Sequence, residues 1–258
     1  FSFQWTRFSE MYAEWEKNFR DYLGPLVEPS WLRGKLVLDA GCGFGRHVYH
    51  AARSGAELIG FDLSEAVQEA HKNTREFAEV HIVQGDIYAL PFRAEFDFIY
   101  SIGVLHHLPD PPSGLVALAQ HLKRGGQVFI WVYGKRTGVQ RAYVVVDLLR
   151  KLTTKMPYRA LYLLTFSLAC LSHLVLVYPY RFLNLIGLKG LASRVPFTAY
   201  AKFPFRVSHA DWFDRLSVPL VVYLDGGDVE SWFETANLTD VRISQKGGVS
   251  WRAIGRRA

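Results

Sequence analysis

The stretch KLVLDAGCGFGRHVYHAARSGAELIGFD, residues 35–62, contains two short apolar runs joined by a glycine-rich turn and a segment of helical spacing. The first run, residues 35–41, ends on an acid and a glycine. Residues 45–55 have helical spacing and close on a glycine, and residues 56–62 form a second apolar run that again ends on an acid. The order strand, helix, strand predicts a βαβ unit with two parallel strands.

The same alternation continues along the chain. We expect further elements in the order helix, strand, strand, helix, strand over residues 64–77, 80–86, 96–103, 113–126 and 127–133. Strands that alternate with helices favour a parallel, doubly wound α/β sheet, and such sheets bind ligands at the carboxyl ends of their strands.

The turn after the first strand indicates the charge of the ligand. Three glycines, Gly41, Gly43 and Gly45, let the backbone approach a ligand before the next helix begins. The third glycine comes one residue too early for the dinucleotide-binding pattern, and Asp39 would repel a pyrophosphate. A cationic ligand suits this turn better.

Acids also end the next two strands. Asp62 lies about 20 residues beyond the glycine turn, where nucleoside-binding folds place the carboxylate that accepts hydrogen bonds from ribose. Asp86 ends the third strand. One such aspartate is more often a cap or turn residue, but acids at the ends of three successive strands are hard to explain by capping alone.

Roughly residues 30–133 resemble class I S-adenosylmethionine-dependent methyltransferases. The stretches that carry the resemblance are VLDAGCGFGR, FDLS, GDIYALPF, FDFIYSIGVLHHLPD and LKRGGQVFIWVY. The resemblance implies S-adenosylmethionine as cofactor: the glycine turn would hold its methionine part, Asp62 its ribose and Asp86 its adenine. The residues implied in cofactor binding within this region are Asp39, Gly41, Cys42, Gly43, Gly45, Asp62, Leu63, Asp86, Ile87, Ser101 and Ile102.

The opening segment resembles a small-molecule and lipid-type subgroup of this family. An F-x-x-Q-W-x-x-F pattern begins at Phe1, and the resemblance implies that Gln4 and Trp5 fold over the cofactor. Near the other end, residues 228–238 predict a helix and residues 240–246 and 250–257 two strands, which match the antiparallel edge pair of the family.

The expected fold is therefore an α/β, doubly wound, mostly parallel seven-stranded sheet, Rossmann-like, with a helical insertion after the fifth strand. The domain organisation that we expect has four parts: an N-terminal helical lid over 1–30, the cofactor-binding core over 31–133, a basic and apolar acceptor lid over 134–227, and a C-terminal helix with edge strands over 228–258.

Composition narrows the class of protein. Half of the 258 residues are hydrophobic, which excludes a disordered chain. Cys42 and Cys170 are the two cysteines and lie far apart, so we expect neither a disulfide framework nor a metal site. No signal peptide is visible in the opening residues. These features predict a cytoplasmic protein.

The net charge of +6 is concentrated in one segment. Residues 135–206 contain twelve lysines and arginines and one acid, Asp147, whereas the rest of the chain has a net charge of −5. Basic residues among aliphatic runs suit an anionic membrane surface or a lipid-linked acceptor, and a basic face could equally follow a nucleic-acid backbone.

An uncharged run of twenty-one residues lies in the same segment. Residues 160–180 are long enough for a transmembrane helix. A single crossing would separate strands of one sheet, so we expect this run to form one or two helices of a lid over the acceptor, either touching a membrane surface or only thickening the core. An RNA-binding insertion gains nothing from such a run, which makes a nucleic-acid partner the less favoured alternative. An apolar lid could also be a subunit interface in a homo-oligomer.

Methyl transfer needs chiefly an aligned nucleophile and a dry site, and it needs a general base only where the acceptor must lose a proton. His106 and His107, in the loop after the fourth strand, are candidates for that base, although a purely structural role is the stronger expectation. His209 with Asp211 is the alternative pair.

The favoured function is methyl transfer to a small, apolar or lipid-linked acceptor. An RNA methyltransferase and a non-catalytic S-adenosylmethionine-binding protein are the alternatives. The methylated atom could be oxygen, nitrogen or carbon.

Overall fold

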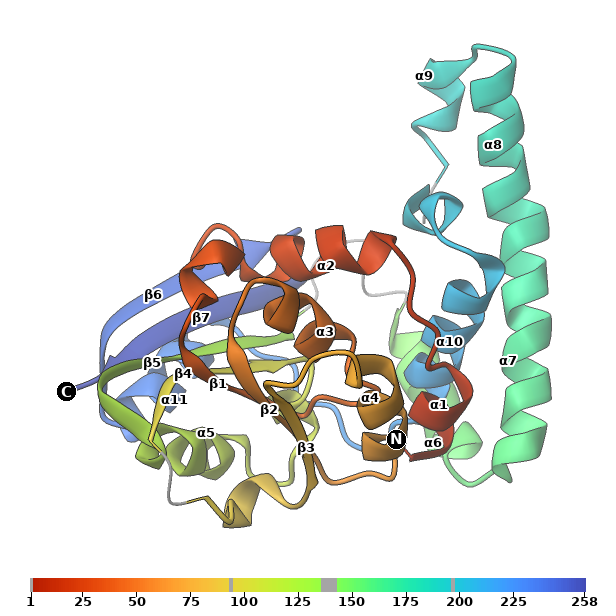
Figure 1. Ribbon diagram of the computed structural model, residues 1–258. Helices are drawn as coiled ribbons and strands as arrows, with labels where there is room; N and C mark the ends of the chain where they lie inside the picture. The colour runs from red at the N-terminus through yellow and green to blue at the C-terminus, as the bar shows by residue number, and fades with distance from the viewer. Residues whose placement is uncertain (1, 93–94, 136–142, 196–197) are drawn as a thin grey trace. The chain divides into compact units, whose positions relative to one another are not determined.

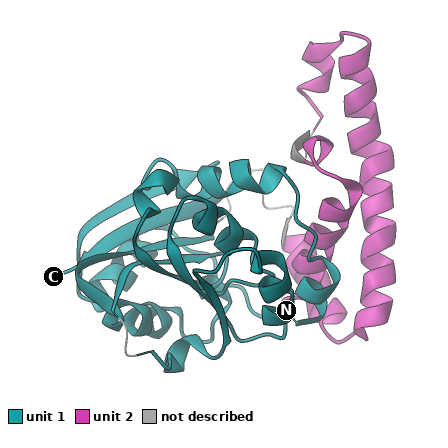
Figure 2. Cartoon of the chain, in the orientation of Figure 1, with its two compact units in different colours: residues 1–140, 220–258 teal, residues 141–219 magenta. Residues whose placement is uncertain are grey.

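The computed structural model describes residues 2–92, 95–135, 143–195 and 198–258. Parts of the predicted lids, namely residue 1 and residues 136–142 and 196–197, lie outside the described residues. The chain forms two compact units (Figure 2). Unit 1 contains residues 1–140 and 220–258, and unit 2 contains residues 141–219.

Unit 1 is built on a seven-stranded sheet in the order β3-β2-β1-β4-β5-β7-β6 (Figure 1). The first five strands run parallel, and β7 lies antiparallel between β5 and β6. This confirms the doubly wound, mostly parallel sheet and its antiparallel edge pair. The strands are β1 Leu36–Ala40, β2 Glu57–Asp62, β3 Val80–Gln84, β4 Phe96–Ile102, β5 Leu122–Tyr133, β6 Leu238–Lys246 and β7 Ser250–Arg257.

Helices cover both faces of the sheet. One buried cluster joins Phe19 and Val48, from α2 and α3, to Phe98 and Phe129 of the strands. A second cluster joins residues of α5 and α11 to the opposite faces of β1, β4 and β5. The helices of unit 1 are α1 Ser2–Arg7, α2 Glu14–Leu23, α3 Arg46–Arg53, α4 Val67–Thr74, α5 Pro111–Gln120 and α11 Gly226–Thr235, with short 3₁₀ turns η1 Pro29–Leu32, η2 Ile87–Ala89 and η3 Leu105–His107.

Several predicted boundaries were wrong, and the helix expected over residues 64–77 spans only Val67–Thr74. The helix expected over residues 113–126 ends at Gln120, and β5 begins at Leu122 instead of residue 127. The early part of β5 contains Gly125 at φ +77° and a register shift against β4, so this stretch lacks a regular strand pattern. The helix expected over 228–238 spans Gly226–Thr235, because a capping box between Asp225 and Asp228 sets its start.

Unit 2 is helical. Its main element is one continuous helix over Tyr158–Leu185, long and apolar enough to cross a membrane by length and composition. Every fourth residue of its central part is buried, from Leu161 to Val177. Its elements are α6 Tyr143–Thr153, α7 Tyr158–Ser172, the π-helical segment η5 His173–Val177, α8 Tyr178–Leu185, α9 Lys189–Ala192, the 3₁₀ turn η6 Thr198–Lys202 and α10 Phe205–Ser217. The structure thus has one long helix where one or two were expected, and the role of this unit as a lid stays a prediction.

Candidate cofactor site

The glycine turn lies at the carboxyl end of β1, tied to the neighbouring strand. The backbone N–H groups of Gly41 and Cys42 both donate to the carbonyl of Phe61, at 2.7 and 3.1 Å. Gly41 has φ +94°, and a Cβ at this position would lie 2.2 Å from Cγ2 of Val104. Only glycine fits there, so the backbone of the turn packs directly against the Val104 side chain.

Asp39 is the most perturbed acid of the site. Its side chain is 1% exposed, and its Oδ2 has no hydrogen-bond partner within the residues that the structure describes. Burial raises the pKa of this carboxyl to about 8. The Tyr100 hydroxyl and the Arg46 guanidinium nearby counteract the rise, although Tyr100 does not meet the geometry of a full hydrogen bond. A buried carboxyl without a partner fits a cationic group such as the ammonium or sulfonium of S-adenosylmethionine.

Asp62 is held firmly at the end of β2. Its Oδ2 accepts from the Gly43 N–H at 2.8 Å, and its Oδ1 accepts from Ser64 N and Oγ at 2.8 and 2.6 Å. Oδ1 thus already accepts two hydrogen bonds, whereas Oδ2 can still accept one more, as from a ribose hydroxyl. Leu63 beside it is 68% exposed, which leaves an apolar side chain next to the acid.

The residues expected on the adenine side differ in their surroundings. Asp86 is exposed, and its Oδ1 accepts from Tyr88 N at 3.0 Å, so it caps η2, whereas Ile87 is buried. Ser101 is buried, and its hydroxyl donates to the Ala40 carbonyl at 2.8 Å. This bond links β4 to β1 directly beside the glycine turn. Ile102 and Cys42 both belong to the buried cluster on the α3 face of the sheet.

The N-terminal helix α1 packs on the glycine turn. The Trp5 ring lies 3.7 Å from the position that a Cβ of Gly43 would occupy, and its centroid is 5.5 Å from that of Phe44. Gln4 is 1% exposed. The Ser2 hydroxyl accepts from the Glu65 N–H at 3.2 Å, so α1 also touches the start of the segment after β2. Gln4 and Trp5 therefore lie next to the turn that was expected to hold the cofactor.

His106 and His107 occupy η3, directly after β4. The His106 ring is fully buried, 4.2 Å from the centroid of Tyr133, and neither of its nitrogens has a hydrogen-bond partner in the described part of the chain. Burial, and then the nearby His107, hold the pKa of His106 well below its usual value. His107 Nδ1 lies 2.8 Å from the Leu220 carbonyl, so this nitrogen donates to that oxygen.

His209 and Asp211 belong to unit 2, where both contact other helices of that unit. His209 is 2% exposed, and its Nε2 lies 3.2 Å from Thr165 Oγ1 and 3.1 Å from the Tyr162 carbonyl. Asp211 accepts from Arg215 Nε at 2.7 Å and from the Tyr200 hydroxyl. The structure thus brings His106 and His107 together in unit 1 and gives His209 and Asp211 packing partners in unit 2.

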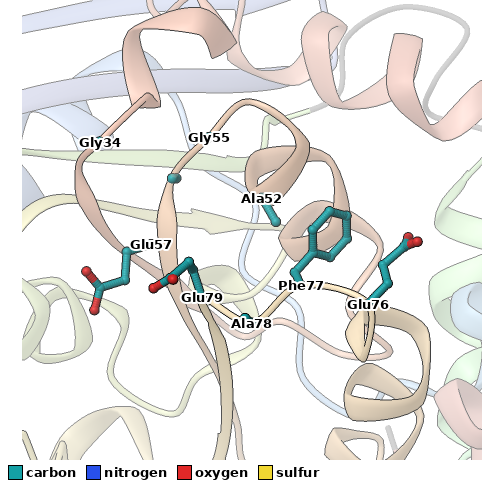
Figure 3. Close-up of a pocket in the computed structure, with 9 residues that line it drawn as sticks. Gly34, Ala52, Gly55, Glu57, Glu76, Phe77, Ala78 and Glu79 are labelled. Carbon is teal, nitrogen blue, oxygen red and sulfur yellow. The ribbon is translucent and has the colours of Figure 1, made fainter.

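A separate cavity of about 430 Å³ lies at the other end of the sheet (Figure 3). Its lining residues precede or begin β1, β2 and β3, and they include Glu57, Glu76 and Glu79. Parallel strands place these amino ends away from Asp39 and Asp62, so this cavity is not the candidate cofactor site. No cluster of three or more side chains suited to a metal occurs among the residues described.

Sequence reasoning missed Tyr100 and the aromatic residues beside His106. Tyr100 shares a face of β4 with Phe98, and a tyrosine in a buried strand needs a partner for its hydroxyl, which was the available signal. Trp131 and Tyr133 lie two residues apart on β5 and so share a face of the sheet, and their ring centroids are 5.3 Å apart. Tyr223 stacks on Tyr133, with their ring centroids 6.3 Å apart. Tyr223 lies in a distant part of the sequence, so no local sequence pattern predicts this contact.

Comparisons with known proteins agree with this geometry. Residues 38–130 match the family described as methyltransferase domain. A tRNA U34 carboxymethyltransferase of Pseudoalteromonas translucida is 34% identical over 126 residues, which cover 47% of this chain and 38% of that protein. A ubiquinone biosynthesis O-methyltransferase of Aromatoleum aromaticum is 34% identical over 138 residues, which cover 48% of this chain and 58% of that protein. The match thus spans less than two thirds of the length of either relative.

Solved structures share the fold across nearly the whole chain. The magnesium protoporphyrin IX methyltransferase of Synechocystis PCC 6803 aligns with a TM-score of 0.55 and 16% identity, over 99% of this chain and 93% of that one. A possible histamine N-methyltransferase of Thermotoga maritima aligns with a TM-score of 0.53 and 12% identity, over 99% and 100%. These likenesses show the fold alone. The family match over residues 38–130, together with the sheet order and the glycine turn, shows that the chain carries a class I S-adenosylmethionine-dependent methyltransferase domain.

Proposed function

We propose that this protein transfers the methyl group of S-adenosylmethionine to a small acceptor that is apolar or lipid-linked. The observation that carries the cofactor part is Asp39, a buried carboxyl with an unpartnered oxygen beside a glycine turn. Asp39 and the turn would bind the methionine part, Asp62 the ribose, and Asp86 with Ile87 and Leu63 the adenine. Ser101 and Ile102 would line the site from β4, and Gln4 and Trp5 would cover it.

The chemistry asks little of the protein beyond alignment. The sulfonium is a good leaving group, so an in-line nucleophile held about 3–3.5 Å from the methyl carbon is the main requirement. A hydroxyl acceptor would also need a base. His106 and His107 are the candidates in unit 1; burial depresses the pKa of His106, which keeps its imidazole neutral and weakens it as a base. His209 with Asp211 stays the alternative pair.

The composition of unit 2 supports an apolar acceptor. Its long helix exposes leucines such as Leu163 and Leu174, which an RNA-binding surface would not need. The relative named for ubiquinone biosynthesis is consistent with this acceptor class. The relatives named for tRNA, together with the basic charge of unit 2, favour RNA as the second candidate.

The test is a labelling experiment with methyl-labelled S-adenosylmethionine and an extract of the source cells, followed by partition between organic solvent and water. We expect label in the organic phase, and none with the Asp39→Asn variant. Label in water that nuclease removes would overturn the apolar acceptor in favour of RNA. Cofactor binding without any transferred label would favour a non-catalytic binding protein.

A further inference from the structure

One side of the long helix in unit 2 is apolar and exposed. The side chains of Leu163, Leu174 and Leu185 are 67, 66 and 84% exposed. We call the following set the apolar face: Leu163, Leu164, Phe166, Leu171, Leu174, Val175, Tyr178, Phe182 and Leu185. Apolar faces of this extent on soluble proteins mark sites where another surface binds.

The buried polar side chains of the same helix contact α10, and the exposed Ser167 hydroxyl donates to the Leu163 carbonyl of its own helix. Thr165 and His173 are buried, and His173 Nε2 lies 2.9 Å from Ser208 Oγ. The Ser172 hydroxyl accepts from Trp212 Nε1 at 3.3 Å. The helix therefore satisfies its polar groups within unit 2 and leaves the opposite side to hydrocarbon. This division of polar and apolar groups is the one that a lipid environment requires.

The charges of the chain segment that contains the apolar face have one sign. No acidic residue occurs between Asp147 and Asp211, whereas nine basic residues do: Arg150, Lys151, Lys155, Arg159, Arg181, Lys189, Arg194, Lys202 and Arg206. Arg159 and Arg181 flank the uncharged run, whose twenty-one residues form a rod about 30 Å long. A surface that is apolar in the middle and cationic at its borders complements a bilayer with anionic headgroups.

We propose that the apolar face binds an anionic phospholipid bilayer and lies within its interface. A second copy of the chain is the weaker occupant, because two acid-free segments with nine cations each would repel one another. The helix does not need to cross the bilayer, since the chain turns at α9 and returns through α10, which carries Asp211 and Asp214. This inference goes beyond methyl transfer and rests on unit 2 alone, so either can fail without the other.

Cys170 is a natural site for a fluorescent label on the long helix. Cys170 is exposed within the uncharged run, and the second cysteine, Cys42, is buried. A thiol-reactive nitrobenzoxadiazole dye at Cys170 would report the polarity around the helix. We expect a blue shift and a rise in emission with vesicles of phosphatidylcholine and phosphatidylglycerol, and a much smaller change with phosphatidylcholine alone. The unlabelled protein should float with the anionic vesicles in a density gradient.

Two variants distinguish weaker insertion of the apolar face into a bilayer from loss of the fold. Leu174→Glu should weaken partition into anionic vesicles by roughly tenfold to a hundredfold, the value of burying one leucine. Val249→Glu, also at an exposed apolar position but in the turn between β6 and β7, should leave partition unchanged. Thermal unfolding of each variant shows that it is folded. A folded protein that ignores anionic vesicles overturns the proposal, and so does a dimer that shields Cys170 and does not bind vesicles.

Discussion

Asp39 allows the proposed cofactor site to be tested through proton linkage. With a pKa of about 8, the buried carboxyl is mostly neutral in the cofactor-free protein at pH 7. A cationic ligand prefers the ionised form, whose population is roughly one tenth at pH 7 and one hundredth at pH 6. The affinity for S-adenosylmethionine should therefore fall about tenfold for each pH unit below 8, and binding should release a proton.

Isothermal titration calorimetry between pH 6 and about 8, in buffers that differ in ionisation enthalpy, measures both the affinity and the protons released. The Asp39→Asn variant has no carboxyl to ionise, so its weakened affinity should lose most of this pH dependence. A wild-type affinity that stays constant over this range, with no proton release, would show that Asp39 does not face the cationic part of the cofactor.

The same carboxyl should lower the stability of the cofactor-free protein. The pKa of Asp39 in the folded state lies above its ordinary value of 3.8, so the stability associated with this group is fully present below pH 4 and is lost as the pH rises toward 8. Each pKa unit corresponds to about 1.4 kcal/mol, so several kcal/mol is the upper bound. We expect Asp39→Asn to melt above the wild type at pH 8 while binding cofactor less well, which thermal unfolding would measure.

Four further variants test the site. Gly41→Ala should lower the Tm and abolish cofactor binding in calorimetry, because the added Cβ would lie 2.2 Å from a valine methyl. Gly125→Ala is the control, since this glycine also has a positive φ but no atom within 4 Å of the added Cβ. It should lower the free energy of unfolding by only about 1–2 kcal/mol and leave cofactor binding intact. Trp5→Ala should weaken cofactor binding roughly tenfold at an unchanged Tm. Tyr100→Phe removes a hydroxyl that opposes the raised pKa of the buried aspartate, so the pH dependence of binding should move to higher pH. If the acceptor is a hydroxyl, His107→Gln should lower kcat by about 10²–10⁴ without changing cofactor affinity in calorimetry.

The local pattern of apolar and polar residues was enough to predict the sheet. It was much less informative about where each helix and strand begins and ends. Short apolar runs that end in acids placed β1 and β2 within a residue or two. The start of β5 was missed because the stretch after Gln120 contains two glycines and a register shift, and neither helical nor strand spacing survives there. Sequence periodicity arises where successive residues alternate regularly between core and solvent, and an irregular strand lacks this alternation.

The site was predictable only where the chain itself brings residues together. Asp39, Gly41 and Asp62 belong to one βαβ unit, so their meeting follows from the order of elements. The position of Tyr223 beside Tyr133 depends on a loop that returns after the whole of unit 2, and no local signal encodes such a contact. Whether a buried histidine such as His106 is a base or a packed ring also depends on three-dimensional surroundings.

Strand β7 is the last strand in the sequence but pairs with β5 in the sheet, so the sheet can be completed only at the end of synthesis. The ribosome completes β5 about 120 residues before it completes the strand that pairs with it, a delay of roughly 6–24 s at ordinary elongation rates. During that time the long helix of unit 2 is already made, while β5 still has an open edge. The nascent chain thus presents its longest uncharged run before the sheet of unit 1 is complete.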